Sequence, residues 1–216
     1  MTKQFWAAIV VVVLVLIGVF TFTNSHKAGA PSSGDVKATQ HITGQGTKGV
    51  TLVEYGDYQC PFCEQYYATV KQVEQMYDSD IHFQFRNFPL VSLHQNAFAA
   101  ARAAEAAALQ NKFWEMHDAL YDPINWQSWT RSNSPANFFN QIAQQLGLNV
   151  TQFKQDFASD RVNKLINADL AEGHHLDVTG TPSFFIDGKK VEISNDVAAF
   201  KKVIDAEIAK KNPSSQ

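Results

Sequence analysis

The stretch that decides the fold is Val50-Thr-Leu-Val-Glu54-Tyr-Gly-Asp-Tyr-Gln-Cys60-Pro61-Phe62-Cys63. Residues 50–55 carry apolar side chains at both odd-numbered and even-numbered positions, which predicts a strand buried on both faces. A short loop follows, and Pro61 opens a helix expected to end near Tyr77, because proline is tolerated in a first helical turn. Residues 81–85 alternate and predict a second strand. Strand, helix and strand with short connections form a right-handed parallel βαβ unit.

The chain beyond this unit predicts a helical block and then a return to strands. Within residues 92–176, helices are expected at 94–110, at 112–121, from Ser134-Pro135 to Gly147, and after N-caps at Thr151 and Ser159. Strands at 183–186 and 190–193 then flank the hairpin turn Asp187-Gly188. Asn195 is expected to cap a last helix that ends near Lys211. The order is that of an α/β protein with a central sheet flanked by helices and an all-helical insertion.

The N-terminal part differs in composition from the rest. Phe5 to Phe22 is an almost unbroken apolar run, FWAAIVVVVLVLIGVFTF, long enough as a helix to cross roughly 27 Å of hydrocarbon. We interpret residues 1–23 as a single transmembrane signal-anchor with its N-terminus in the cytoplasm, and a cleaved signal peptide is the alternative. Residues 24–48 then form a flexible linker that ends in a short strand at 41–43. The domain covers 49–212 and a tail covers 213–216.

Composition and charge exclude several classes of function. Of the 216 residues, 45% are hydrophobic and 18% charged, and the formal net charge is −3, so the chain has no basic footprint for nucleic acid. Only two cysteines are present, which excludes a scaffold of several disulfides. Export past a membrane places this cysteine pair where disulfides persist.

The spacing of Cys60 and Cys63 at the start of a helix predicts redox chemistry. A cysteine at a helix N-cap lies beside free N–H groups and the positive end of the helix dipole, which stabilise a thiolate. The alternatives are a structural disulfide, half of a zinc site, or two unrelated buried thiols. Zinc would need two further ligands, and the sequence offers no third cysteine and no histidine pair at zinc-ligand spacing beyond the adjacent His174 and His175. A disulfide across so short a loop would restrict the unfolded chain little.

Two further positions are candidates for the same site. Glu54 lies within an apolar strand, where a carboxylate is costly without a task, so we expect it beneath the cysteines with a raised pKa, relaying a proton to or from Cys63. The alternative is a carboxylate that reaches solvent at the strand end. Pro182, preceded by Gly180-Thr181, opens an apolar strand at a turn that could hold a cis peptide. Thr181 would then offer its backbone to an extended substrate chain. His117 is expected to be packed rather than catalytic.

These residues resemble the DsbA-like thiol–disulfide oxidoreductases of the thioredoxin superfamily, in their membrane-tethered form. The resemblance runs from about His41 to Lys211 and includes Phe113-Trp-Glu-Met-His-Asp118 and Gly180-Thr-Pro-Ser-Phe-Phe185 besides the Cys60–Cys63 motif. It implies a thioredoxin-like fold with a central mixed sheet, Cys60 as attacking and Cys63 as resolving cysteine, Glu54 as buried acid and Pro182 as cis-proline. Phe62 stands where the best-studied oxidase has histidine, and Thr181 where it has valine.

The resulting hypothesis is an extracytoplasmic, membrane-anchored disulfide oxidase that acts on reduced exported proteins through Cys60-Pro61-Phe62-Cys63. It needs no cofactor beyond its own disulfide, holds no metal, acts as a monomer, and is reoxidised by a quinone-linked membrane enzyme of the DsbB or vitamin K epoxide reductase type. One alternative is an isomerase or reductase kept reduced by an electron donor. Another is a module that binds copper through both thiolates.

Overall fold

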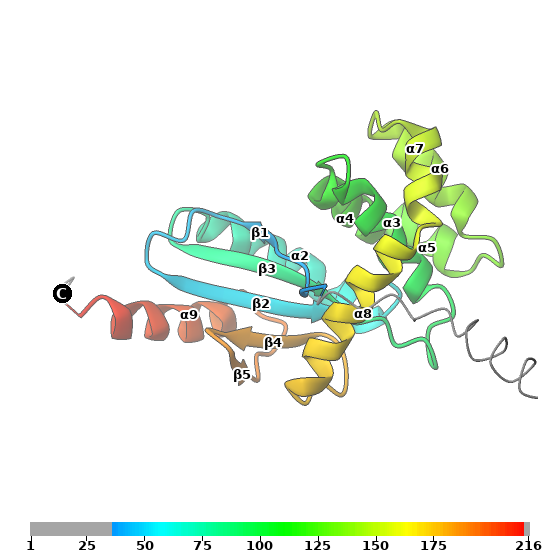
Figure 1. Ribbon diagram of the computed structural model, residues 1–216. Coiled ribbons are helices and arrows are strands. Elements are labelled where there is room, and N and C mark those ends of the chain that lie inside the picture. The colour runs from blue at the N-terminus through cyan, green and yellow to red at the C-terminus, as the bar shows by residue number, and fades with distance from the viewer. Residues whose placement is uncertain (1–35, 214–216) are drawn as a thin grey trace, which may run out of the picture. The chain divides into compact units, whose positions relative to one another are not determined.

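The computed structural model describes residues 36–213. Within them, the strands form one mixed sheet in the order β1-β3-β2-β4-β5 (Figure 1). The strand bounds are His41–Thr43 for β1, Val50–Gly56 for β2, Ile81–Asn87 for β3, Ser183–Ile186 for β4 and Lys189–Val191 for β5. The central mixed sheet expected from the sequence is confirmed.

The predicted βαβ unit lies at the centre of this sheet. Strands β2 and β3 are parallel neighbours, paired from Val50 with Ile81 to Gly56 with Asn87. Helix α2, Pro61–Met76, connects them. Strand β4 returns antiparallel along the other side of β2. The end of β2 therefore lies between the start of α2 and the start of β4, and this is where the sequence motifs meet.

Helices cover both faces of the sheet. On one face, α2 and α9, Val197–Lys211, bury a core that includes Leu52, Phe83 and Phe184. On the other face, the C-terminal part of α8, Asp160–His175, packs near a smaller core around Tyr55 and Phe185. Alternate residues of β2 thus enter opposite cores, which explains why this strand is apolar at both parities.

The helical insertion follows β3 and forms its own core. Its helices before α8 are α3, Ala97–Ala108; α4, Phe113–Tyr121; α5, Pro123–Thr130; α6, Ala136–Gln145; and α7, Val150–Phe157. Helix α3 is central because it contacts α4, α6, α7 and α8. Its buried alanines allow the neighbouring helices to approach closely. The two cysteines and Phe85 belong to this same core, so the insertion packs directly against the motif.

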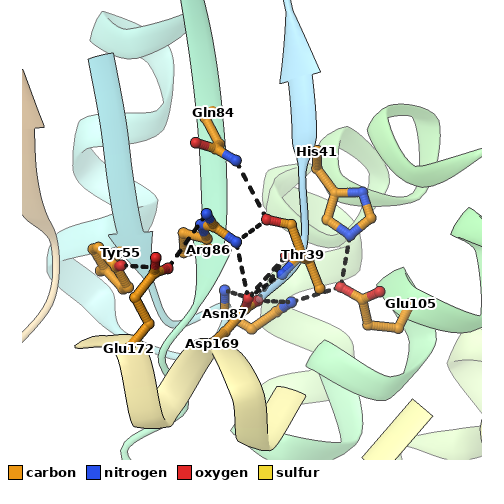
Figure 2. A network of polar contacts seen from close by, with 9 residues as sticks. All are labelled: Thr39, His41, Tyr55, Gln84, Arg86, Asn87, Glu105, Asp169 and Glu172. Atoms are coloured by element: carbon orange, nitrogen blue, oxygen red, sulfur yellow. Dashed lines mark hydrogen bonds and ion pairs between the residues drawn. The ribbon is translucent and has the colours of Figure 1, made fainter. Parts of the chain in front are cut away.

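A buried polar network joins the insertion to the sheet (Figure 2). The carboxylate of Asp169 on α8 is fully buried and accepts hydrogen bonds from the backbone N–H of Thr39 at 2.6 Å and of Asn87 at 3.0 Å. The Thr39 hydroxyl donates to both of its oxygens. Arg86 adds an ion pair at 3.4 Å, and Asn87 also donates to the buried carboxylate of Glu105 on α3 at 2.7 Å. Each buried charge is therefore partnered, as its burial requires.

The structure corrects the predicted start of the domain. Residues 37–48 belong to the folded unit, because Thr39 enters the polar network and β1 pairs antiparallel with β3. The composition of this segment suggested a linker, but its glycines form turns. Gly44 has a φ of 78°, and a Cβ there would lie 2.3 Å from the carbonyl oxygen of Ile81.

Several predicted boundaries are also corrected. Helix α5 was not predicted, and α3 begins at Ala97 rather than at 94. Asn149 caps α7 in place of Thr151, since its side chain accepts a hydrogen bond from Gln152 N–H and its backbone has the extended conformation of an N-cap residue. Asp196 rather than Asn195 is the N-cap residue of α9, and β5 spans 189–191 instead of 190–193. Ser159 caps α8 as predicted.

Among residues 36–213, no helix combines the length and the apolar character that a membrane crossing needs. The expected anchor, residues 1–23 with the apolar run 5–22, lies outside the described residues, as do residues 24–35 of the expected linker.

Candidate active site

Cys60 is the N-cap residue of α2, at the point where the sequence placed it. Its backbone is extended, and its carbonyl accepts the first helical hydrogen bond from Glu64 N–H at 3.1 Å. Pro61 follows in the first turn, where its missing N–H leaves no partner unsatisfied. Cys63 lies one turn further along the same helix. Both cysteines are free thiols, 4% and 1% exposed respectively.

The surroundings of the two sulfurs shift their acidities in opposite directions. The pKa of Cys60 is lowered to about 5, first by a hydrogen bond from the Cys63 thiol, against the opposing effect of burial, and then by the Thr181 side chain and the backbone N–H groups of residues 62 and 63. Burial, reinforced by the same hydrogen bond and by Glu54, raises the pKa of Cys63 above its usual range. At neutral pH the reduced site therefore holds a thiolate at Cys60 and a thiol at Cys63.

Glu54 lies in the strand that leads into the cysteine loop, close enough to the two sulfurs for their charges to influence one another. It occupies the same sheet face as its cross-strand partners Phe85 and Phe184, and Phe85 packs in the core that contains both cysteines. The side chain does not reach solvent at the strand end, since the residue is only 5% exposed. Burial, with smaller contributions from Glu74 and Cys60, raises the pKa of Glu54 to about 8. A carboxyl group with this pKa can give or take a proton near neutral pH.

The start of β4 completes the site. The peptide bond between Thr181 and Pro182 is cis, as the resemblance implied. The Cys60 thiol donates to the Thr181 carbonyl oxygen at 3.4 Å. The sequence-predicted residues Glu54, Cys60, Cys63, Thr181 and Pro182 are thus brought together by three elements, β2, α2 and the start of β4.

A groove of about 350 Å³ opens at the cis-proline turn, and one of its lining residues, Thr181, has its carbonyl oxygen 3.4 Å from Cys60 Sγ. Phe62, which is 63% exposed, lies at one side of it, and Thr181 with Pro182 lies at another. The groove also includes Tyr66, Thr179, Gly180, Ser183, Phe184 and residues 190–193. An extended chain placed here would run past the Thr181 backbone, beside the sulfur of Cys60.

Sequence reasoning missed Asp57, which makes contacts to both cysteines. Its backbone N–H donates to Cys63 Sγ at 3.5 Å and its carbonyl accepts from Cys60 N–H at 3.0 Å. Its buried carboxylate accepts from His94 Nδ1 at 2.7 Å. The local signal for Asp57 was its place in a turn, where aspartate commonly accepts from the N–H two residues later. His94 had no local signal.

His117 is buried and packed, as expected, and burial lowers its pKa well below the usual range. Its Nδ1 lies 3.1 Å from the hydroxyl of Tyr58. Tyr121, another aromatic residue beside the sulfurs, donates to the Asp57 carbonyl oxygen at 3.3 Å. These rings exclude water from the inner side of the cysteine pair.

Comparison with known proteins supports the geometry. Residues 37–206 match a family model described as Thioredoxin. Among curated proteins, the chain is 34% identical over 171 residues to Na(+)/H(+) antiporter NhaA 1 of Mycolicibacterium gilvum and 33% identical over 168 residues to that of Mycolicibacterium vanbaalenii. Each match covers 77% of this chain but 26% of the relative, so the chain spans about a quarter of the length of the curated relatives it matches.

Solved structures share the fold over most of their length. A thioredoxin-like oxidoreductase from Silicibacter pomeroyi is 27% identical, with a TM-score of 0.65 over 77% of this chain and 91% of its own. BdbD from Bacillus subtilis is 19% identical, with a TM-score of 0.66 over 78% and 92%. Wolbachia pipientis alpha-DsbA1 is 21% identical, with a TM-score of 0.68 over 82% and 95%. The last two likenesses concern the fold.

Proposed function

Because the chain belongs to the thioredoxin family, we propose that it is a thiol–disulfide oxidoreductase, and specifically an oxidase that transfers the Cys60–Cys63 disulfide to reduced client proteins. The observation that carries the proposal is the geometry of the dithiol: Cys60 caps α2 with Cys63 one turn later, and Cys60 Sγ lies 3.4 Å from the Thr181 carbonyl oxygen at the cis-Pro182 turn. These surroundings lower the pKa of Cys60 and raise that of Cys63. A stabilised Cys60 thiolate favours the reduced site over its disulfide, so the disulfide is readily given up.

The exchange proceeds in two steps at the Cys60 sulfur. A client thiolate attacks Cys60 Sγ, the bond to Cys63 breaks, and its electron pair remains on Cys63 Sγ. Glu54, protonated below a pKa of about 8, then supplies a proton to Cys63. A second client thiolate attacks the client sulfur of the mixed disulfide, and Cys60 leaves as a thiolate. The client is oxidised by two electrons and the protein is reduced by two.

The place and the partners of this reaction are part of the proposal. We place the domain on the extracytoplasmic side of the cell membrane, held by residues 5–22, where exported clients are still reduced. The reduced dithiol then needs a membrane oxidant, a quinone-linked enzyme of the DsbB or vitamin K epoxide reductase type. The protein works as a monomer without a dissociable cofactor. Cell fractionation with protease treatment of intact cells tests the location, because an exported domain is degraded without lysis.

The test of the activity is oxidation of a reduced, unfolded test protein by the purified oxidised domain, with one equivalent of disulfide formed per equivalent consumed. Cys60→Ser should be inactive. Cys63→Ser cannot form the internal disulfide, but when its reduced Cys60 attacks a disulfide of an oxidised test protein the mixed disulfide should accumulate, because the resolving thiol is absent. Oxidation by wild type no faster than by Cys60→Ser would contradict the proposal. Equilibration with a glutathione buffer separates an oxidase from a reductase, because the oxidase must lie on the oxidising side of glutathione.

The copper-binding alternative predicts a different result. A metal module would bind Cu(I) tightly in its reduced form and leave thiol oxidation rates unchanged. The antiporter name of the curated relatives describes chains of which the match covers 26%, whereas the site described above is a dithiol. We therefore propose no ion transport for this domain.

A further inference from the structure

Asp57 lies in the loop between β2 and α2, three residues before Cys60, and its carboxylate is fully buried. It accepts hydrogen bonds from Gln59 N–H at 2.7 Å, from Leu90 N–H at 2.8 Å and from His94 Nδ1 at 2.7 Å. Because all three contacts are short and at least one oxygen is shared by two donors, the carboxylate has little freedom to rotate.

This anchored carboxylate fixes the direction of the Asp57 backbone. The Asp57 N–H points to Cys63 Sγ at 3.5 Å, while the carbonyl on the other side accepts from Cys60 N–H and from the Tyr121 hydroxyl. The donor is therefore aimed at the sulfur that must carry negative charge when the disulfide opens. If the carboxylate lost its anchor, the backbone N–H would lose its direction.

Two of the three donors to the Asp57 carboxylate, Leu90 and His94, come from a loop that is itself held in place. Residues 88–94 follow β3, and the loop begins where Phe88 N–H donates to the Gly56 carbonyl at 2.8 Å. Immediately before it, Asn87 is bound to Asp169 and Glu105 in the buried polar network (Figure 2). The side chain of His94 is 18% exposed and contacts Asp57 rather than either sulfur.

We propose that Asp57 and His94 are positioning residues for thiol exchange: the His94–Asp57 hydrogen bond holds the Asp57 N–H on Cys63 Sγ, where it stabilises the departing thiolate. The inference rests on the proposed function. When a client thiolate bonds to Cys60 Sγ, the electron pair of the broken bond goes to Cys63 Sγ. The Asp57 N–H donates to that sulfur until Glu54 protonates it. Preorganised donors at a developing charge are an effective way to lower a barrier.

The test compares His94→Leu with His94→Asn as its matched control. Leucine removes the donor to Asp57, whereas asparagine places an amide N–H where Nδ1 lies. The oxidised proteins are mixed rapidly with reduced glutathione, and the second-order rate of disulfide opening is measured. We expect His94→Leu to be slower by roughly tenfold, the loss of about one hydrogen bond to a charged group, and His94→Asn to stay near the wild-type rate.

A second measurement separates positioning from a general loss of structure. Alkylation of reduced Cys60 by iodoacetamide depends on the Cys60 thiolate and not on Cys63 as a leaving group. It should stay within about twofold of wild type in both variants, since Cys60 is stabilised mainly by Cys63, Thr181 and the start of α2. Equal slowing of both reactions, or no slowing of disulfide opening, overturns the inference.

The proposal can also be tested if a variant fails to fold, and it can be distinguished from a failure of the proposed function. If His94→Leu does not fold, Asp57→Asn makes the same comparison, because it keeps the side-chain volume but turns an amide donor toward the donors of the loop. It should slow disulfide opening as well, and an unchanged rate would contradict the inference. If wild-type protein does not exchange with glutathione at all, the proposed function fails instead, and the variants are not needed to show it.

Discussion

The sulfur of Cys60 lies 3.4 Å from the carbonyl oxygen of Thr181, a residue 121 positions later in the chain. In the thiol form, the S–H group donates to this oxygen. Ionisation removes that donor, so the Thr181 carbonyl becomes available to an N–H group of an extended client segment. We therefore expect client docking at the cis-Pro182 loop to be favoured by the thiolate form of Cys60.

The first prediction concerns the source of the low Cys60 pKa. Because the Cys63 thiol is the largest cause of the shift to about 5, Cys63→Ala should raise the pKa of Cys60 by at least about one unit. Cys63→Ser keeps a hydroxyl donor and should raise it less. Thiolate ultraviolet absorbance as a function of pH measures both values. Equal pKa values in the two variants would mean that the helix start alone stabilises the thiolate.

The second prediction concerns proton transfer by Glu54. Glu54→Gln preserves volume and hydrogen-bonding capacity but cannot carry the proton, so disulfide exchange should slow by roughly 10²-fold, near the lower end for general acid–base groups. The wild-type rate should fall above pH 8, as Glu54 ionises, and this limb should be missing from the variant. A variant with the wild-type pH profile would assign Glu54 no part in the reaction.

The third prediction concerns stability. The same substitution, Glu54→Gln, that slows disulfide exchange should raise the free energy of unfolding at high pH. The pKa of Glu54 is about 8 when folded and near 4.5 when unfolded, so between these pH values the folded chain holds a proton that the unfolded chain has released. Its contribution to the free energy of unfolding therefore falls as pH rises from about 4.5 to 8. Reduced Glu54→Gln should equal wild type near pH 4 and exceed it above pH 8, by up to about 5 kcal/mol.

Denaturant unfolding of both reduced proteins at each pH checks this difference. Cys60 ionises in both proteins, so its contribution to the free energy of unfolding is removed when the two are compared. Because its pKa is lowered on folding, that contribution grows between pH 5 and 9. If the difference in the free energy of unfolding stays constant across the pH range, the pKa of Glu54 is not raised on folding, and water solvates its carboxylate in the folded protein.

The fourth prediction concerns Phe62, whose backbone N–H contributes to the low Cys60 pKa and whose side chain borders the groove. Phe62→His should make the protein a stronger oxidant, since an imidazole can donate to the Cys60 thiolate or place positive charge beside it. One unit of lowered pKa corresponds to about 1.4 kcal/mol and to about 30 mV for a two-electron couple. The thiolate titration and a glutathione equilibrium should therefore shift together. A lower pKa with an unchanged potential would contradict this coupling.

The fifth prediction concerns the buried network around Asp169. Thr39→Val keeps the shape of the side chain but removes a hydroxyl that donates to the carboxylate at 2.8 Å and 3.0 Å. The free energy of unfolding should fall by about 1.5–3 kcal/mol, as for hydrogen bonds to charged groups. Thr39→Ser, which retains the hydroxyl, should lose less. Similar losses in the two variants would attribute the effect to the methyl group instead.

Local patterns were enough to predict much of the fold and most of the site. The strand, loop and helix from Val50 to Tyr77 depend on side-chain periodicity and on Pro61, both of which are visible in a short window. The buried Glu54 was predictable because a carboxylate interrupts an apolar strand. Helix α5 was missed because its apolar residues follow no clear face: Trp129 is buried while Ile124 is 80% exposed. The sequence feature that could have predicted this helix is Asp122 before Pro123, since aspartate is a favoured N-cap residue and proline is tolerated in the first turn.

Contacts between distant segments were beyond such reasoning. Asp57 and His94 are separated by 37 positions, and Thr39 and Asp169 by 130. Nothing in the sequence near His94 indicates that its ring turns toward the cysteine loop. The same holds for Thr39, which is buried although its glycine-rich and threonine-rich neighbourhood is typical of a tether; the short strand at 41–43 was predicted and is β1.

The alanine-rich helix α3 has a consequence for how this domain can change through evolution. Ala100, Ala103, Ala104 and Ala107 are all fully buried between neighbouring helices. Burying alanine costs almost no rotamer entropy, so the helix is an inexpensive centre for the insertion. Larger side chains at these positions are not tolerated, however, because even a small increase in side-chain volume destabilises a packed core. Sequence drift should therefore be rare on this helix and concentrated on the outer faces of α5, α6 and α7, where the insertion can diversify without disturbing the dithiol beneath it.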